Sequence, residues 1–282
     1  MSHKLFRLAA SVFNTPQLIT ASEFRPIVNY LQDRNNLDKF LGNPVYTGSP
    51  GKGVDTEELD IFNGVGVVQI SGLLTYKPAE LLCQESTSYQ DLLGEVEDLI
   101  EAGVKAVIFE CNSGGGEAGH MFTTANEIKR LLSEAGIPSI AYVDTLAASA
   151  CYGLACVCDE IIIHPEARAG SIGAMIALVD DSKAMEEAGL KEIYITDKPG
   201  KVPFGKDGSF KDSFLEKLQG EVDALGAKFN AHVQANTGIQ IEEITALDAQ
   251  VFTAEDCLSK GLVNKIMDHN QFADYVSSKF SN

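Results

Sequence analysis

The sequence predicts an α/β protein in which a mostly parallel β-sheet is flanked by helices. Short apolar runs alternate with amphipathic segments between residues 65 and 163, an alternation typical of β-α-β units. The apolar runs are nearly continuous, as burial on both faces of a sheet requires. With 282 residues, the chain is long enough for one large domain with appendages and for a sizeable core.

The elements follow one another in the order that this class requires. In the first expected helix, Leu92, Val96 and Leu99 share one face, and Gly103 is placed to end it. Strands are expected where the sequence is continuously apolar, at 65–71, 104–110, 138–143, 160–163 and 172–179. Helices are expected where apolar or small residues recur at helical spacing, at 90–103, 120–136, 147–158 and 212–236.

The region before residue 59 has a different texture, with weak periodicity. Residues 43–55 are rich in Gly, Pro and Ser, which is typical of a linker or loop. We therefore divide the chain into an N-terminal extension and linker (1–58), a main domain (59–270) and a C-terminal tail (271–282).

The charge of the chain excludes some classes of partner. There are 40 Asp and Glu residues against 22 Lys and Arg, a net charge of −18. Nucleic acids and anionic membrane surfaces bind clustered Lys and Arg, so we expect neither as a partner. The acidity favours solubility instead.

The cysteines and the apolar runs indicate a cytoplasmic protein. The six cysteines form no CxxC pair and no zinc-ligand spacing, so a reducing compartment is expected. The most apolar run, 137–158, contains Pro138 and Asp144 and reads as a buried strand and helix rather than as a membrane span. We expect no membrane anchor.

A glycine-rich segment, ECNSGGGEAGH at 110–120, lies between an expected strand and an expected helix. Successive glycines allow backbone N–H groups to turn toward one point, which suits an anion. A phosphate loop is excluded because no Lys-Ser/Thr pair follows the glycines. An oxyanion hole and a simple tight turn both remain open.

A single hydroxyl, Ser149, stands among small residues in DTLAASACYG at 144–153. If Ser149 follows a strand and begins a helix, the next N–H, that of Ala150, is available to an oxyanion. The alternative is that these residues are small because a helix packs closely there. Ser149 is thus a candidate nucleophile.

A serine nucleophile needs a base. His164 is the histidine nearest in sequence, and His120 follows the glycines at the end of the glycine-rich segment, but neither has an obvious orienting partner. A lysine can serve if its pKa falls from about 10.4 to about 7–8, a shift that burial must supply. Several lysines lie on the Gly/Pro loop 195–205, and a hydroxyl such as Ser171 could hold the neutral amine.

Taken together, these segments resemble the SppA-like serine peptidases (signal peptide peptidase A family) on the ClpP/crotonase fold. The resemblance is greatest to the phage-encoded members that act as prohead or capsid maturation proteases, and it extends in order over residues 60–268. The segments that carry it are NSGGGEAG, TLAASACYGLACVCDEI, HPEARAGSIGAM, ITDKPGKVP and VFTAEDCLSKGLVNKI.

The resemblance implies a ClpP/crotonase-like β-β-α superhelix and a Ser-Lys endopeptidase without cofactor or metal. Its catalytic residues would be Ser149 as nucleophile, Lys201 as general base and Ser171 as the hydroxyl that orients the lysine. The oxyanion hole would be formed by the amides of Gly115 and Ala150, with Gly114 shaping the turn. Residues 59–270 would then be the peptidase domain.

The lysine loop is the part that matches least, and Lys198 and Lys206 compete with Lys201 for the role of base. The resemblance also implies that the substrates are scaffold, portal or capsid proteins. It implies a homo-oligomer that works in the host cytoplasm, within the assembling prohead.

Three alternatives remain open. A ClpP-like triad would pair Ser149 with His164 and with Asp144 or Asp159. A crotonase-like acyl-CoA enzyme would use the same glycine-rich turn without a serine nucleophile. A non-catalytic assembly protein would keep the fold alone.

Overall fold

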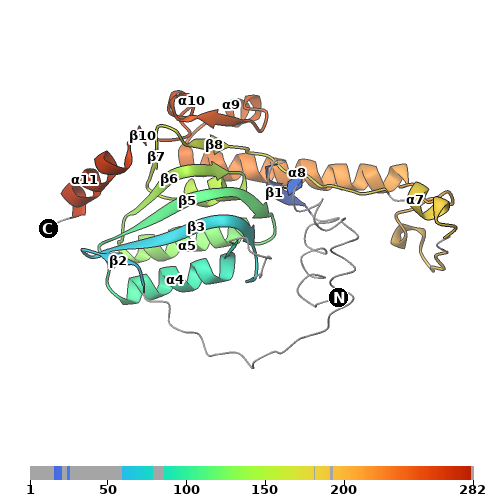
Figure 1. The fold of residues 1–282 in the computed structure, drawn as a ribbon, viewed down its shortest axis with the longest axis horizontal. Coiled ribbons are helices and arrows are strands. Elements are labelled where there is room, and N and C mark those ends of the chain that lie inside the picture. The colour runs from blue at the N-terminus through green and yellow to red at the C-terminus, as the bar shows by residue number, and fades with distance from the viewer. Residues whose placement is uncertain are drawn as a thin grey trace.

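The computed structural model describes residues 16–20, 24–25, 59–78, 86–180, 182–190 and 193–280. Within these residues a ten-stranded, mostly parallel sheet forms the centre of the molecule, and helices pack against it (Figure 1). The expected α/β class, a mostly parallel sheet flanked by helices, is confirmed.

The sheet has a central path and several short strands beside it. The central path, in spatial order, is β10 (Lys265–Ile266), β7 (Glu160–Ile163), β6 (Ser139–Ala148), β5 (Ala106–Glu117), β3 (Val65–Thr75) and β2 (Ile61–Phe62). Only β2 runs antiparallel to its neighbour on this path. The strands beside the path are β1 (Gln17–Ile19), β4 (Ser86–Ser88), β8 (Arg168–Gly170) and β9 (Val251–Thr253).

The helices bury the faces that their periodicity predicts. In α4, Leu92, Val96 and Leu99 are buried, and the helix begins where the Ser88 side chain accepts a hydrogen bond from the Asp91 N–H. The helices of the described residues are α4 (Tyr89–Glu101), α5 (Met121–Ala135), α6 (Ala150–Ala155), α7 (Ser182–Glu187), α8 (Asp212–Thr237), α9 (Ile241–Ala246), α10 (Ala254–Ser259) and α11 (His269–Phe280).

Two expected elements differ from the structure. The strand expected at 138–143 continues to Ala148, so the following helix begins at Ala150 rather than at residue 147. The strand expected at 172–179 is wrong, because this run has no neighbouring strand along its length. Only Met175 pairs, through an isolated bridge to Gln17.

The glycine-rich segment is the end of strand β5 rather than a separate turn. Gly115 and Gly116 pair with Leu73 and Leu74 of β3. A side chain at Gly116 would overlap the backbone of Leu74, so glycine is required there by close approach.

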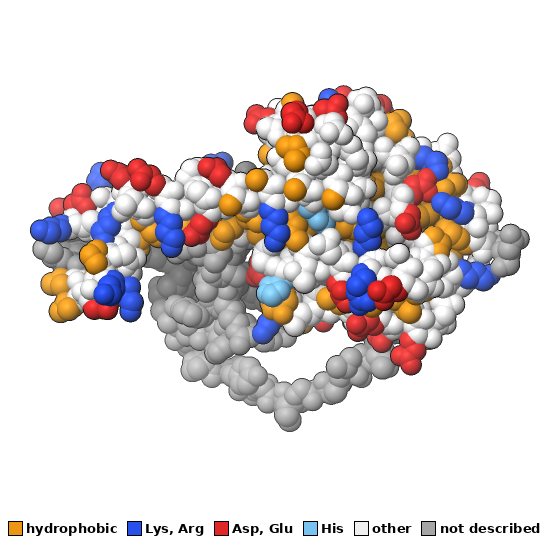
Figure 2. All heavy atoms as spheres, turned by 180° about the vertical axis from the view of Figure 1, so that it is seen from behind, with side chains coloured by type: hydrophobic (Ala, Val, Ile, Leu, Met, Phe, Trp, Pro, Cys, Tyr) orange, Lys and Arg blue, Asp and Glu red, His pale blue; other side chains and the backbone are white. Residues whose placement is uncertain are grey.

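Helix α8 carries an arm away from the sheet (Figure 1). Its last third is anchored in the core by Phe229 and Val233, whereas its first half is mostly exposed. We call residues 182–190, residues 193–211 and the first half of α8 the arm. In Figure 2 hydrophobic and lysine side chains gather at its tip. The exposed hydrophobic residues of the arm are Leu190, Ile193, Tyr194, Ile195 and Leu215.

The expected C-terminal tail is largely helical. Residues 271–280 belong to α11, which packs Phe272, Tyr275 and Val276 against buried hydrophobic side chains of β3, β5, β6 and β7. Most of the expected extension 1–58 lies outside the described residues. Among the described helices, none is long and apolar enough to cross a membrane.

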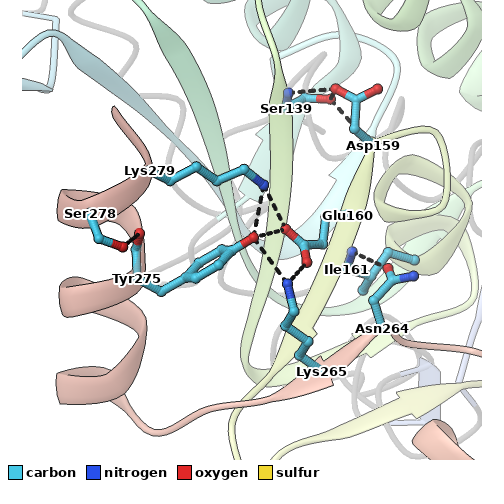
Figure 3. A network of polar contacts seen from close by, with 9 residues as sticks. All are labelled: Ser139, Asp159, Glu160, Ile161, Asn264, Lys265, Tyr275, Ser278 and Lys279. Carbon is cyan, nitrogen blue, oxygen red and sulfur yellow. Dashed lines mark hydrogen bonds and ion pairs between the residues drawn. The ribbon is translucent and has the colours of Figure 1, made fainter. Parts of the chain in front are cut away.

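A polar network fixes α11 to the edge of the sheet (Figure 3). Glu160 of β7 accepts hydrogen bonds from Tyr275 at 2.6 Å and Lys279 at 3.0 Å, and it also pairs with Lys265. Burial raises the pKa of Glu160, but the bonds from Lys265, Tyr275 and Lys279 outweigh it and lower the pKa to about 2. The carboxylate therefore stays charged in the folded protein.

Replacing Glu160 with Gln should loosen α11 at neutral pH. The depressed pKa of Glu160 stabilises the fold above its unfolded value, near 4.3, and this contribution is lost as the pH falls toward about 2. Glu160→Gln should therefore speed amide hydrogen exchange in α11. It should also make the free energy of unfolding depend less on pH between those two values. Glu127→Gln, in an exposed pair with Arg130, is the control and should change neither. Unchanged exchange in α11 would contradict this role.

Candidate active site

Ser149 lies at the junction of β6 and α6 in a strained backbone conformation. Its φ of 55° and ψ of −120° lie in a region that residues with a side chain rarely occupy. The Ser149 N–H donates to the Gly170 carbonyl at 2.8 Å, and the Ser149 carbonyl accepts from the Gly153 N–H at 3.0 Å. The strand before it and the helix after it therefore hold the serine in this conformation.

The Ser149 hydroxyl is buried and has no hydrogen-bond partner among the described residues. Leaving a buried hydroxyl unpaired costs about 1–3 kcal/mol. Together with the strained backbone, this cost means that the Ser149 side chain does not stabilise the fold.

The glycine-rich end of β5 lies directly against Ser149. Gly115 has a φ of 104°, and a Cβ atom there would come 3.0 Å from Ser149 Cβ and 3.1 Å from the Ala148 carbonyl oxygen. The Gly115 N–H donates to Ser113 Oγ at 3.1 Å, and the Gly114 carbonyl accepts a backbone N–H at 3.0 Å. The two segments that the motifs singled out thus meet at one point.

Two further expected residues adjoin this point. Ala150 follows Ser149 directly, is fully buried and begins α6. Ser171 follows Gly170, which lies opposite Ala148 in the pairing of β6 with β8. The Ser171 N–H donates to the Gln250 carbonyl at 2.8 Å, and its φ is 54°.

Lys201 does not lie with these residues within one chain. It is exposed, at the end of the short 3-10 turn Pro199–Lys201 in the arm. Lys211 ties this turn to the start of α8 by donating to the carbonyls of Pro199 at 3.1 Å and Val202 at 2.6 Å. From there α8 rises about 25 Å before it reaches Phe229, which packs beside α6.

The competing lysines share this placement. Lys198 and Lys206 belong to the same exposed loop of the arm. The structure therefore assembles the serine and the glycine-rich segment but leaves the three candidate lysines apart from them.

The histidine triad does not assemble around Ser149. The His164 N–H donates to the Val143 carbonyl, and Ser149 lies six residues beyond Val143, on the order of 15–20 Å along an extended strand. Asp144 pairs with His269 at 2.7 Å, and Asp159 binds Ser139. His120 stacks on Tyr76.

His232 is a residue of the site region that the sequence reasoning did not single out. It is buried, and its Nε2–H donates to the Gly153 carbonyl at 2.8 Å, which fixes α6 against α8. Its sequence position could have indicated burial, because His232 lies next to Val233, one of the regularly spaced apolar residues of the predicted helix. Burial, the largest cause, lowers the pKa of His232 despite the bond to Gly153.

The stability of the fold should therefore fall as the pH drops below about 6.5, since the unfolded chain then binds a proton that buried His232 resists. His232→Gln keeps a donor for Gly153 but does not titrate. Thermal unfolding between pH 7 and pH 5 should depend less on pH in this variant than in the wild type. Parallel curves for the two proteins would show that His232 has no such effect.

The described residues contain no group of three or more His, Cys, Asp or Glu that could hold a metal ion. The groups that meet at Ser149 are hydroxyls and backbone amides, which suit acyl transfer.

The family profile of Peptidase family S49 matches residues 132–279, more than half of the chain. The chain belongs to Peptidase family S49. This match confirms the resemblance drawn from the motifs. It includes Ser149, Ser171 and Lys201, whereas the glycine-rich end of β5 lies before it.

Two curated relatives of this S49 peptidase-family chain come from phages. The chain is 24% identical over 284 residues to the head-tail preconnector protein GP5 of Enterobacteria phage P21, covering 95% of this chain and 56% of the relative. It is 24% identical over 210 residues to the capsid assembly protease C of Escherichia phage lambda, covering 74% of this chain and 47% of the relative. The chain thus spans about half the length of these relatives.

Two solved structures are also similar to this S49 family chain. The 1510-N membrane-bound stomatin-specific protease matches with a TM-score of 0.39 and 16% identity, covering 74% of this chain and 77% of that protein. A putative enoyl-CoA hydratase/isomerase (crotonase) from Legionella pneumophila matches with a TM-score of 0.43 and 15% identity, covering 79% and 74%.

Proposed function

We propose that the protein is a serine endopeptidase that cleaves proteins of an assembling phage head, with Ser149 as its nucleophile. The observation that carries the proposal is the buried Ser149 hydroxyl, which has no hydrogen-bond partner among the described residues. Its backbone is strained, and it lies beside the glycine-rich end of β5. Membership of Peptidase family S49 supports peptide-bond cleavage.

In the proposed reaction Ser149 Oγ attacks a peptide carbonyl while Lys201 accepts the hydroxyl proton. The N–H groups of Gly115 and Ala150 stabilise the oxyanion, and Gly114 shapes the turn that presents Gly115. Lys201 then gives the proton to the leaving amine, and water hydrolyses the acyl-enzyme. Ser171, beside Ser149, orients the lysine amine.

Because Lys201 lies on the arm, we propose that the dyad is completed between copies of the chain. The arm exposes Ile193, Tyr194 and Ile195, with 78%, 51% and 97% of their surfaces accessible. Exposed apolar surface of this kind marks a protein interface, and homo-oligomers bury it symmetrically. An arm packed on a second copy would carry Lys201 to a neighbouring Ser149.

The names of the two phage relatives support the choice of substrate. One is a capsid assembly protease and the other a head-tail preconnector protein. We infer that scaffold, portal or capsid proteins are the substrates, and that cleavage takes place in the host cytoplasm within the assembling head.

The test is to incubate the purified protein with denatured casein and with the scaffold protein of the same phage, followed by intact-mass analysis. Discrete fragments with new termini are expected. No cleavage of either substrate by folded protein at any pH from 6 to 10, together with no reaction of Ser149 with a fluorophosphonate probe, would favour the non-catalytic assembly protein, which the placement of Lys201 also fits.

A further inference from the structure

A short strand from the N-terminal extension occupies the edge of the glycine-rich segment. β1 pairs antiparallel with the end of β5, in a register that places Ile19 opposite Gly115. The N–H of Thr20 donates to the Gly114 carbonyl at 3.0 Å. In Figure 1 this strand is the short blue arrow at the end of β5. It therefore lies on the edge to which we assign oxyanion binding.

The same strand is also bound on its other side. The Gln17 N–H donates to the Met175 carbonyl at 2.8 Å, and the Met175 N–H donates to the Gln17 carbonyl at 3.0 Å. The segment thus lies between two backbone edges and pairs with both. An extended peptide from another protein would find the same donors and acceptors, as in strand addition to a sheet.

The strand comes close to the nucleophile. A Cβ atom at Gly115 would overlap the Leu18 carbonyl oxygen and would also contact Ser149 Cβ, so both lie against one side of Gly115. Leu18 and Ser149 are fully buried. Within β5 itself, the Gly115 N–H donates a hydrogen bond to Ser113 Oγ.

We propose that Gln17–Thr20 is a built-in inhibitor that fills the substrate groove beside Ser149 and must leave before a substrate binds. The substrate then enters as an extended strand between Gly115 and Met175, with an apolar side chain in the place of Leu18. This inference rests on the proposed function, since it assigns the groove of the same site.

The first test replaces Leu18 in the full chain. Leu18→Asp puts a charge where the structure is fully buried, and Phe62→Asp makes the same change at an exposed position of strand β2. A fluorophosphonate probe that labels serine nucleophiles should react with Ser149 at least about tenfold faster in Leu18→Asp than in the wild type, because the closed form no longer dominates. Phe62→Asp should react like the wild type.

A second version of the labelling experiment is used if thermal unfolding shows that Leu18→Asp does not fold. A recognition sequence for a site-specific protease replaces part of 43–55, and the folded chain is nicked there so that the piece before the nick can dissociate. Labelling should again accelerate after nicking. A synthetic peptide of residues 15–22 should slow it, and the same peptide with Leu18→Lys should not. Equal labelling before and after nicking, or labelling of folded Leu18→Asp no faster than that of the wild type, would overturn the inference.

Peptide binding separates this inference from the proposed function. The fluorescent 15–22 peptide is titrated into the nicked chain that also carries Ser149→Ala, and anisotropy reports binding without any catalysis. Binding there with no probe reaction in any form would refute the nucleophile and keep the groove. Probe reaction in the wild type with no peptide binding would refute the groove and keep the nucleophile.

Discussion

Replacing Ser149 with alanine is expected to lower kcat/KM for cleavage by about 10⁴-fold or more. The change removes only Oγ, which has no hydrogen-bond partner among the described residues. Because an unpaired buried hydroxyl destabilises a fold, Ser149→Ala should leave the melting temperature unchanged or raise it. Cleavage rates from fragment masses and a thermal unfolding curve measure both effects.

Ser139 provides the matched control, because it is a buried serine at the start of β6, the strand that leads to Ser149. Its hydroxyl donates to Asp159 and accepts from the Asp159 N–H. Ser139→Ala should therefore lower the melting temperature, by breaking a satisfied pair, while cleavage continues. The opposite pattern, with activity kept in Ser149→Ala and lost in Ser139→Ala, would exclude Ser149 as the nucleophile.

Replacing Lys201 with alanine is expected to lower kcat/KM by about 10³-fold or more without affecting stability, since the side chain is exposed. Lys198→Ala and Lys206→Ala are the matched controls from the same loop and should stay within about threefold of the wild type. Full activity in Lys201→Ala would assign the base to another residue.

Mixing the two inactive variants tests whether the lysine comes from a second copy. An equimolar mixture of Ser149→Ala and Lys201→Ala should regain about a quarter of wild-type activity if neighbouring copies share sites at random. A dyad within one chain gives no recovery. Absence of recovery would therefore require the arm to fold back onto its own Ser149.

Local sequence predicted the parts of the site that lie close together along strands and turns. Ser149 was singled out as a hydroxyl among small residues and Gly115 as part of a glycine run, and the structure brings the two together. The helix after Ser149 was expected too early, at residue 147. The small residues at 147–148 are compatible with a helix or with a buried strand. They form a strand because they pair with β5 and β8.

Contacts between distant residues could not be predicted from the sequence. Gln17 and Met175 are brought together by the sheet, and neither has a local pattern that indicates a pair. The position of Lys201 depends on α8, whose periodic apolar residues run from Phe214 to Val233. Only the last of these are buried in the core. Periodicity predicted the helix, but it could not predict which half packs against the sheet and which half carries the arm.

The most direct test of the central claim is to identify the residue that reacts with a fluorophosphonate probe. Wild-type protein and its Leu18→Asp and Ser149→Ala variants are labelled, digested and sequenced by tandem mass spectrometry. The account predicts one adduct, on Ser149, in the wild type and in Leu18→Asp, and none in Ser149→Ala. An adduct on another serine, together with cleavage that survives in Ser149→Ala, would contradict it.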